Sequence, residues 1–125
     1  MSEAPTAIVC DDAPGFRALM TALLEEAGLR VVGDCETWAE AERLAPGIDA
    51  VVVDLWMPDI DIAALQRIRA ACPAATLAVV TALGLDDAAA RVGDVGIDLL
   101  LAKFAPPAEV AGTIAAHCRG RAAAC

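Results

Sequence analysis

The sequence predicts a doubly wound α/β fold, in which a five-stranded parallel sheet carries helices on both faces. Five short apolar runs alternate along the chain with five segments of helical length, and the third run, 50–53, contains no polar residue. A strand that is apolar on both faces is buried on both, as in the middle of a parallel sheet. Right-handed crossovers between parallel strands then place helices on both faces.

Boundary signals support each element in order. The expected strands cover residues 6–10, 29–35, 50–53, 76–80 and 97–102. The expected helices cover residues 14–27, 37–45, 61–71, 86–92 and a last stretch from 106. Gly28 gives the first helix a C-terminal stop, Thr37 and Glu40 have the spacing of a capping box, and Pro73 prevents the third helix from continuing.

Composition excludes several classes of function. The net charge of −9 argues against this chain itself gripping nucleic acid, whose phosphates need a basic face. No window approaches the roughly 20 apolar residues of a membrane span, and the N-terminus lacks the pattern of a signal peptide. We therefore expect a cytoplasmic protein without a membrane partner.

The cysteine pattern predicts free thiols. The sequence contains five cysteines, at positions 10, 35, 72, 118 and 125. Their odd number and wide separation fit neither a disulfide framework nor paired zinc ligands. We expect unpaired thiols in a reducing compartment.

Polar residues stand at the end of four expected strands. Asp11 and Asp12 follow the first, Asp54 follows the third, Thr81 ends the fourth and Lys103 follows the fifth. Open parallel sheets bind ligands outside the carboxyl ends of their strands, where the strand order reverses. With the order 2-1-3-4-5, that point lies between the first and third strands. We expect all five side chains to meet there.

Three carboxylates at one edge need a counter-charge. At about 5 Å and an effective dielectric constant near 20, each pair repels by roughly 3 kcal/mol. Either one carboxyl is protonated or a cation neutralises the group. Oxygen ligands without a nearby His or Cys favour Mg²⁺ or a similar ion.

These residues resemble a known family. The acidic pair Asp11–Asp12, the segment Asp54-Leu-Trp-Met-Pro58, Thr81 and Lys103 resemble the receiver domain of bacterial two-component response regulators. The resemblance covers the chain from Ala7 to about His117 and implies the flavodoxin-like receiver fold. The starts of the first and last helices look most like the NarL/LuxR-type transcriptional regulators.

The resemblance implies a role for each acidic residue. Asp54 would accept a phosphoryl group from a sensor histidine kinase. Asp12, Asp54 and the backbone carbonyl of Trp56 would bind Mg²⁺ directly, and Asp11 would act largely through water. The chain would be a phosphoacceptor signalling domain that assists its own phosphorylation and dephosphorylation, not an enzyme with a separate substrate.

The remaining residues would carry the switch. Lys103 would pair with Asp54 and then with the phosphoryl oxygens, while the Thr81 hydroxyl would bind the phosphoryl group and swing inward. The family usually has an aromatic residue where Leu100 stands, so the switch from the threonine to an aromatic residue cannot take its usual form. It usually has a glycine where Ile62 stands, so the loop into the third helix would differ in shape. Bulky side chains at Trp56 and Leu83 would hinder the hydrolytic water.

The resemblance also implies partners and domain limits. We expect a receiver domain at 1–118, followed at 119–125 by a tail or the start of a linker. Its partners would be the kinase and a possible homodimer, with DNA bound, for transcription regulation, only through an output domain not in this chain.

Three alternatives stay open. Taken alone, Asp11 and Asp12 are more typical of acids that cap the first helix, and it is their combination with Asp54 that favours the cation site. The whole chain would also suit a pseudo-receiver, a binding or dimerisation module that signals without phosphorylation. A hydrolase of phosphoryl substrates ranks behind both, because no general acid or base stands near Asp54 in the sequence.

Overall fold

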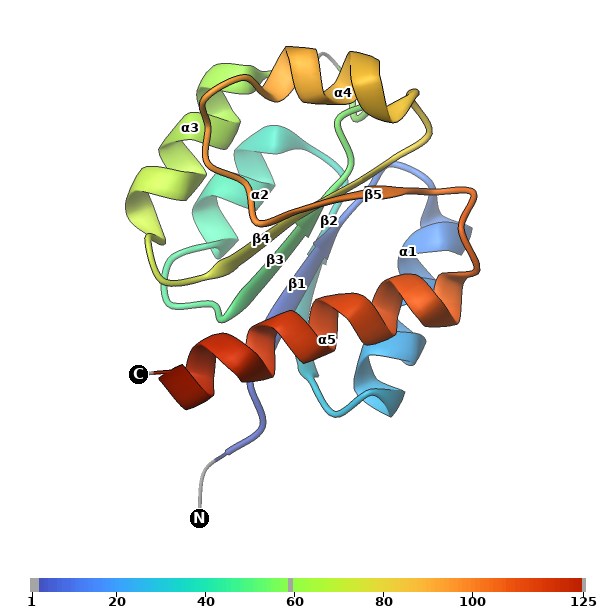
Figure 1. The fold of residues 1–125 in the computed structure, drawn as a ribbon, viewed down its shortest axis with the longest axis vertical. Helices are drawn as coiled ribbons and strands as arrows, with labels where there is room; N and C mark the ends of the chain where they lie inside the picture. Colours follow the sequence, from blue (N-terminus) through green and yellow to red (C-terminus); the bar gives the residue numbers. More distant parts are fainter. Residues whose placement is uncertain (1–2, 59, 125) are drawn as a thin grey trace.

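The computed structural model describes residues 3–58 and 60–124, with side chains as far as Arg121. Within them, one parallel sheet has the order β2-β1-β3-β4-β5, which confirms the predicted fold class (Figure 1). The strands are β1 Thr6–Cys10, β2 Arg30–Cys35, β3 Ala50–Val53, β4 Thr76–Thr81 and β5 Leu99–Ala102. The helices are α1 Pro14–Glu26, α2 Trp38–Leu44, α3 Ile62–Ala71, α4 Leu85–Val92 and α5 Pro107–Ala124.

Two apolar layers sandwich the sheet, with α1 and α5 on one face and α2, α3 and α4 on the other (Figure 1). Successive side chains of a strand point to opposite faces. Along β3, Ala50 and Val52 therefore pack in the layer of α1 and α5, while Val51 and Val53 pack in the layer of α2 and α3. All four are buried, as the absence of polar residues in this run predicted.

Element ends differ from the predictions by one or two residues, and hydrogen bonds explain where they fall. Asp61 is the N-cap of α3 rather than its first residue, since its carboxylate accepts a hydrogen bond from the Ala64 N–H at 3.0 Å. The Thr37 hydroxyl accepts one from the Glu40 N–H at 3.2 Å, which confirms the predicted capping box. Helix α5 runs through the boundary predicted at residue 118, so the division into domain and tail stays a prediction.

The prediction of unpaired thiols was wrong for Cys10 and Cys35, which form a disulfide. They end the neighbouring strands β1 and β2 and are partners in the parallel register, with Cα atoms 4.6 Å apart. That separation is within the range that a disulfide spans. Their 25-residue separation in sequence gave no hint of it, because it is the pairing of the two strands that brings them together. Among the described cysteines, Cys72 and Cys118 are free and buried.

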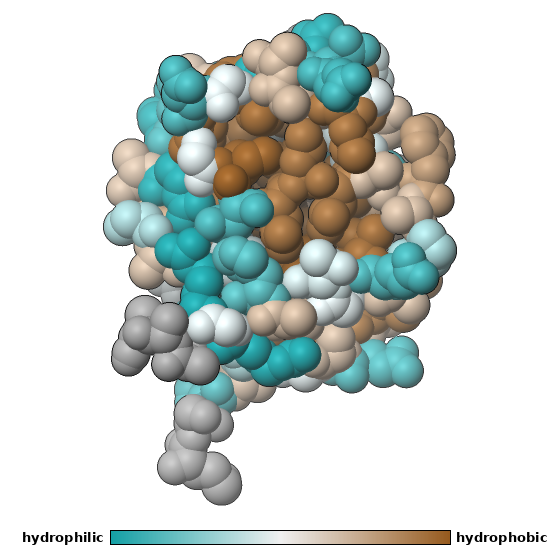
Figure 2. Space-filling view, in the orientation of Figure 1, coloured by the Kyte–Doolittle hydropathy of each residue, from teal (hydrophilic) through white to brown (hydrophobic). Residues whose placement is uncertain are grey.

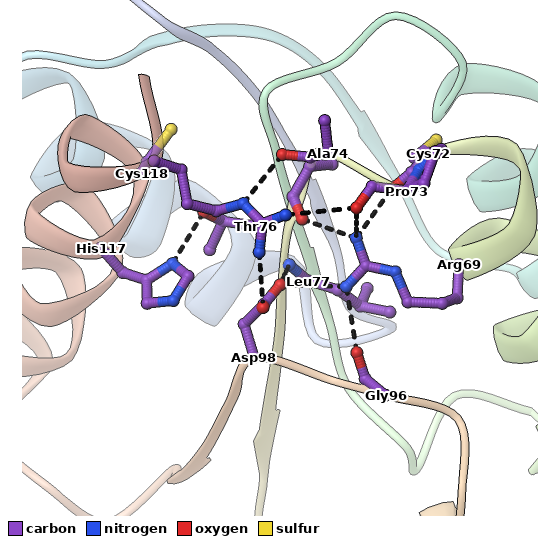
Figure 3. Close-up of polar contacts among 12 residues, drawn as sticks. Arg69, Cys72, Pro73, Ala74, Thr76, Leu77, Gly96, Asp98, His117 and Cys118 are labelled. Carbon is purple, nitrogen blue, oxygen red and sulfur yellow. Dashed lines mark hydrogen bonds and ion pairs between the residues drawn. The ribbon is translucent and has the colours of Figure 1, made fainter. Parts of the chain in front are cut away.

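At the amino edge of the sheet, opposite the acidic residues, Asp98 holds two arginines (Figure 3). Its carboxylate lies 3.0 Å from Arg69 Nη1 on α3 and 2.8 Å from Arg121 Nη1 on α5. The same carboxylate accepts the Leu77 N–H at 2.8 Å. Both guanidinium groups also donate to backbone carbonyls of the loop at 72–75. The cluster thus ties α3, α5 and the start of β5 to one another.

The charge state of Asp98 follows from these contacts. Burial by itself would raise the pKa of Asp98, but the Leu77 N–H and the two arginines outweigh it and lower the pKa. Nearby, the Thr76 hydroxyl and His117 Nδ1 lie 2.9 Å apart, which joins α5 to β4 (Figure 3). His117, predicted to be structural and partly exposed, is half-buried in this contact.

Among the described helices, none combines the length and the hydropathy that a membrane span requires.

We predict that Asp98→Asn lowers the free energy of unfolding by about 2 kcal/mol at pH 7, because two arginines lose their counter-charge. The folded pKa lies below the unfolded value of about 3.9, so the contribution is present above that pH and disappears as pH falls through the folded pKa. Urea unfolding at pH 7 measures the loss of stability, and urea unfolding at pH 3 measures how far the difference between variant and parent shrinks in acid. Asp94→Asn, at an exposed position, is the control; equal stability of parent and Asp98→Asn at pH 7 would contradict the prediction.

Candidate functional site

The ends of β1 and β3 place two carboxylates side by side. Asp11 follows β1 and Asp54 follows β3, and these strands are neighbours in the sheet. The Asp54 N–H donates to the Cys10 carbonyl at 3.0 Å, and the Asp11 N–H donates to the Cys35 carbonyl at 2.9 Å. Both aspartates therefore extend the backbone ladder by one residue, which fixes where their side chains start.

The predicted acidic cluster is present. Carboxylate oxygens of Asp11, Asp12 and Asp54 all lie within 4.8 Å of one another. Asp11 and Asp54 are 1% and 3% exposed, while Asp12 is exposed to solvent. Two buried carboxylates thus line the floor of the site and a third closes it from the rim.

Lys103, the only lysine in the sequence, is shared between the two buried carboxylates. Its Nζ lies 2.8 Å from Asp11 Oδ2 and 3.0 Å from Asp54 Oδ2. The backbone N–H of Lys103 donates to the Thr81 carbonyl at 2.8 Å, which anchors Lys103 directly after β5. Burial alone would lower the pKa of Lys103, but the hydrogen bonds and charges of Asp11 and Asp54 raise it, so the side chain is an ammonium ion.

The other oxygens of these carboxylates close two turns. Asp11 Oδ1 accepts the Ala13 N–H at 2.8 Å, and Asp54 Oδ1 accepts the Trp56 N–H at 3.0 Å. The N-cap residue of α1 is Ala13, and it makes no side-chain capping bond. The acidic pair is therefore not the cap of this helix, and the capping alternative loses its main support.

Two residues of α1 belong to the site although the sequence offered no specific signal for them. Lys103 Nζ lies 4.5 Å from the centre of the Phe16 ring, a cation–π contact. Arg17 Nη1 donates to the Asp11 carbonyl at 2.6 Å, and its Nε lies 3.4 Å from Asp34 Oδ2. The first turn of α1 thus supports both the lysine and the backbone of the acidic pair.

The residues predicted for the switch lie on β4 and β5. Thr81 is fully buried, and its hydroxyl accepts the Leu83 N–H at 3.2 Å. Thr81 pairs with Ala102 in the register of the two strands, and half-buried Leu100 pairs with Val79. On the rim, Trp56, two residues after Asp54, is 57% exposed, and Phe104, the residue after Lys103, is 81% exposed.

The donor set fits a small divalent cation. The cluster gathers three carboxyl groups around a single lysine, so its formal charge is negative. Hard oxygen donors and such a negative charge suit Mg²⁺ or a similar ion. Asp12, the exposed member, leaves the cluster open toward solvent, as a cation that also meets a substrate requires.

Comparison with protein families decides the assignment. A family model described as the response regulator receiver domain matches residues 7–115. The chain belongs to the response regulator receiver family. The match begins at the second residue of β1, covers the other four strands in full and ends half-way along α5, so the receiver assignment applies to the whole sheet and its acidic edge.

Solved structures of receiver domains share this fold. A LuxR-family response regulator from Aurantimonas sp. SI85-9A1 is 31% identical, with a TM-score of 0.82 over 96% of this chain and 88% of that one. A CheY-like receiver from Methanospirillum hungatei JF-1 is 16% identical, with a TM-score of 0.86 over 98% and 100% of the two chains. The signal receiver domain of the response regulator NarL from Mycobacterium tuberculosis is 22% identical, with a TM-score of 0.77 over 95% and 99%.

One curated relative matches this chain over part of its length. A protein-glutamate methylesterase/protein-glutamine glutaminase from Hahella chejuensis is 32% identical over 84 residues, which are 65% of this chain. The aligned part is only 24% of that relative. The likeness therefore concerns the receiver and carries no enzymatic activity to this chain.

We predict that Lys103→Met lowers the free energy of unfolding by about 2 kcal/mol at pH 7 in metal-free buffer, because two buried carboxylates lose their cation. The raised pKa of Lys103 makes its contribution complete below the unfolded value of about 10.4, and the contribution is lost as pH rises through the folded pKa. Urea unfolding measures the loss. Lys103→Arg keeps the charge and should recover part of the stability; a Met variant as stable as the parent would contradict the account.

Proposed function

We propose that this receiver domain accepts a phosphoryl group on Asp54 from a sensor histidine kinase, with Mg²⁺ as cofactor, and thereby switches its contacts with a partner or a second copy. The observation that carries the proposal is the position of Lys103 Nζ, 3.0 Å from Asp54 and 2.8 Å from Asp11 at the carboxyl edge of the sheet. Because Lys103 lies between two buried carboxylates, its ammonium group can move a hydrogen bond to a new negative charge added at either of them.

The residues divide the work of the transfer. An oxygen of Asp54 attacks the phosphorus of a phosphohistidine, so that an O–P bond forms as the N–P bond breaks and the imidazole leaves with the bonding electron pair. Asp12, Asp54 and the backbone carbonyl of Trp56 would hold Mg²⁺, with Asp11 acting through water. The ion, when bound, offsets the repulsion between the attacking carboxylate and the phosphoryl oxygens. Lys103 then moves its hydrogen bond from the Asp54 carboxylate to the phosphoryl group.

Thr81 is the residue through which we propose the switch operates. Its hydroxyl accepts the Leu83 N–H, so its own O–H proton remains to be donated to a phosphoryl oxygen. A shift of this buried hydroxyl toward Asp54 leaves space on the β4–β5 side, and Leu100 is the side chain that would fill it. Because Leu100 is aliphatic, the repacking would be smaller than with the aromatic residue that the family usually has there. Leu100 also has no hydroxyl group that would need a hydrogen-bond partner.

The face between α4 and α5 is the surface that we propose changes its contacts. Figure 2 shows apolar side chains gathered there, over β5. Leu99, Leu100 and Leu101 are all only half-buried, because β5 is the edge strand of the sheet. Repacking at Leu100 would therefore alter a surface as well as the interior.

We propose that the signal received by this domain regulates transcription. It is supported by the 31% identity to a LuxR-family response regulator, of which this chain covers 88%. With a net charge of −9, the receiver itself would not grip DNA, so an output domain would make that contact. A cytoplasmic location would follow from the kinase as partner.

Intact mass after incubation with acetyl phosphate and Mg²⁺ tests the phosphoacceptor. We expect one phosphoryl adduct on the parent and none on Asp54→Asn, because the amide is not a nucleophile. Asp49→Asn, at an exposed position far from the acidic edge, should take up the adduct as the parent does. A parent without an adduct would favour the pseudo-receiver, and an adduct on Asp54→Asn would place the acceptor elsewhere.

We predict that Trp56→Asn speeds dephosphorylation by roughly tenfold, a barrier lowered by about 1.4 kcal/mol, because a smaller polar side chain admits the attacking water. The indole is exposed beside Asp54 and would shield the phosphoryl group from the attacking water. Loss of the radiolabelled or mass-detected adduct over time gives the rate. Phe104→Asn, the other exposed apolar residue of the rim, is the control; equal rates for parent and Trp56→Asn would remove the idea.

A further inference from the structure

The disulfide between Cys10 and Cys35 lies directly beneath the acidic cluster. Cys10 is the residue before Asp11, and Cys35 is its partner across the register of β1 and β2. Neither the proposed phosphoryl transfer nor the fold alone requires a bond there, since the two strands are already joined by their backbone ladder. The bond therefore calls for a separate explanation.

Both buried aspartates are anchored on the backbone of these two cysteines. The Asp11 N–H donates to the Cys35 carbonyl at 2.9 Å, and the Asp54 N–H donates to the Cys10 carbonyl at 3.0 Å. A change in the spacing of the two strand ends consequently moves Asp11 relative to Asp54. These are the same carboxylates that share Lys103.

Breaking the bond forces such a change. Two bonded sulfurs lie about 2 Å apart, whereas two sulfurs merely in contact need roughly 4 Å. Cys10 and Cys35 are 1% and 3% exposed and pack in the apolar layer with Trp38 and Ala41 of α2. The Cα atoms, 4.6 Å apart, already have about the usual spacing of neighbouring strands, so the sulfurs separate by rotation of the two side chains. Because the layer around them is close-packed, that rotation displaces their neighbours and shifts the strand ends.

The strand that can move is β2. It is an edge strand that pairs with β1 alone, and its register with β1 already shifts between Ala7 and Ile8. Local opening of such an edge occurs at lower free energy than global unfolding, and it gives a small thiol access to the buried bond. Disulfides in proteins from reducing compartments are, where present, usually of this reversible kind.

We propose that Cys10 and Cys35 form a reversible redox site, which exchanges with low-molecular-weight thiols and disulfides and whose state sets the Mg²⁺ affinity of the acidic cluster. In reduction, two thiol molecules give up two electrons and two protons: the protein S–S bond breaks, both cysteines become thiols, and one S–S bond forms between the donors. Oxidation by a small disulfide is the reverse. The link to Mg²⁺ rests on the proposed function, whereas the thiol chemistry does not.

The experiment compares the two redox states of the full chain carrying Cys125→Ser, which leaves four cysteines. After incubation with glutathione disulfide or dithiothreitol, the protein is denatured, alkylated with iodoacetamide and weighed. We expect two alkylated cysteines in the oxidised form and four in the reduced form. The Mg²⁺ dissociation constant of each form follows from tryptophan fluorescence, because Trp56 adjoins the cluster.

We expect reduction to weaken Mg²⁺ binding by roughly tenfold, the low end for loss of a group that supports metal ligands. Cys35→Ser should bind Mg²⁺ like the reduced form under both conditions, and Cys72→Ser, which removes a buried cysteine outside the pair, should keep the redox response. Four alkylated cysteines after oxidation would overturn the proposal. Equal Mg²⁺ affinities in both states would also overturn it while leaving the proposed function intact, whereas absence of Mg²⁺ binding in both states would overturn the two together.

Discussion

The sharing of Lys103 between Asp11 and Asp54 is the contact on which the site depends. Three elements must be in place for it: β1 and β3 as neighbours to bring the carboxylates together, and β5 ending at the same edge to deliver the lysine. Two buried carboxylates without this ammonium group would repel each other strongly. The lysine cancels only part of the charge, so the arrangement suits a cation and, in the function proposed above, a phosphoryl group.

At the opposite, amino edge of the sheet, the negative charge of a carboxylate is compensated within the protein. There one carboxylate, Asp98, is held by two arginines, so the local charge is compensated and the carboxylate has no excess charge with which to attract a ligand. That edge fastens α3 and α5 to the sheet. The ionic cluster at the amino edge is thus charge-compensated and structural. The acidic cluster at the carboxyl edge is only partly compensated, and that is the edge where open parallel sheets bind ligands.

Sequence patterns predicted the fold because they act locally and agree with one another. The apolar run at β3, the Thr37 capping box and the polar residues at strand ends each depend on neighbours in the chain, and the strand order then places Asp11, Asp54 and Lys103 together. The Cys10–Cys35 bond was missed because it depends on the exact register of two strands. The supporting contacts of Phe16 and Arg17 were missed for a similar reason, since they depend on the direction of side chains on one turn of α1.

The most direct test of the central claim is the effect of Mg²⁺ on the free energy of unfolding. If the crowded carboxylates attract the ion, Mg²⁺ at ten times its dissociation constant stabilises the parent by about 1.4 kcal/mol. Asp54→Asn, which removes one charge from the cluster, should lose most of that gain, and Asp94→Asn should keep it. A parent whose stability does not change at millimolar Mg²⁺ would contradict the account.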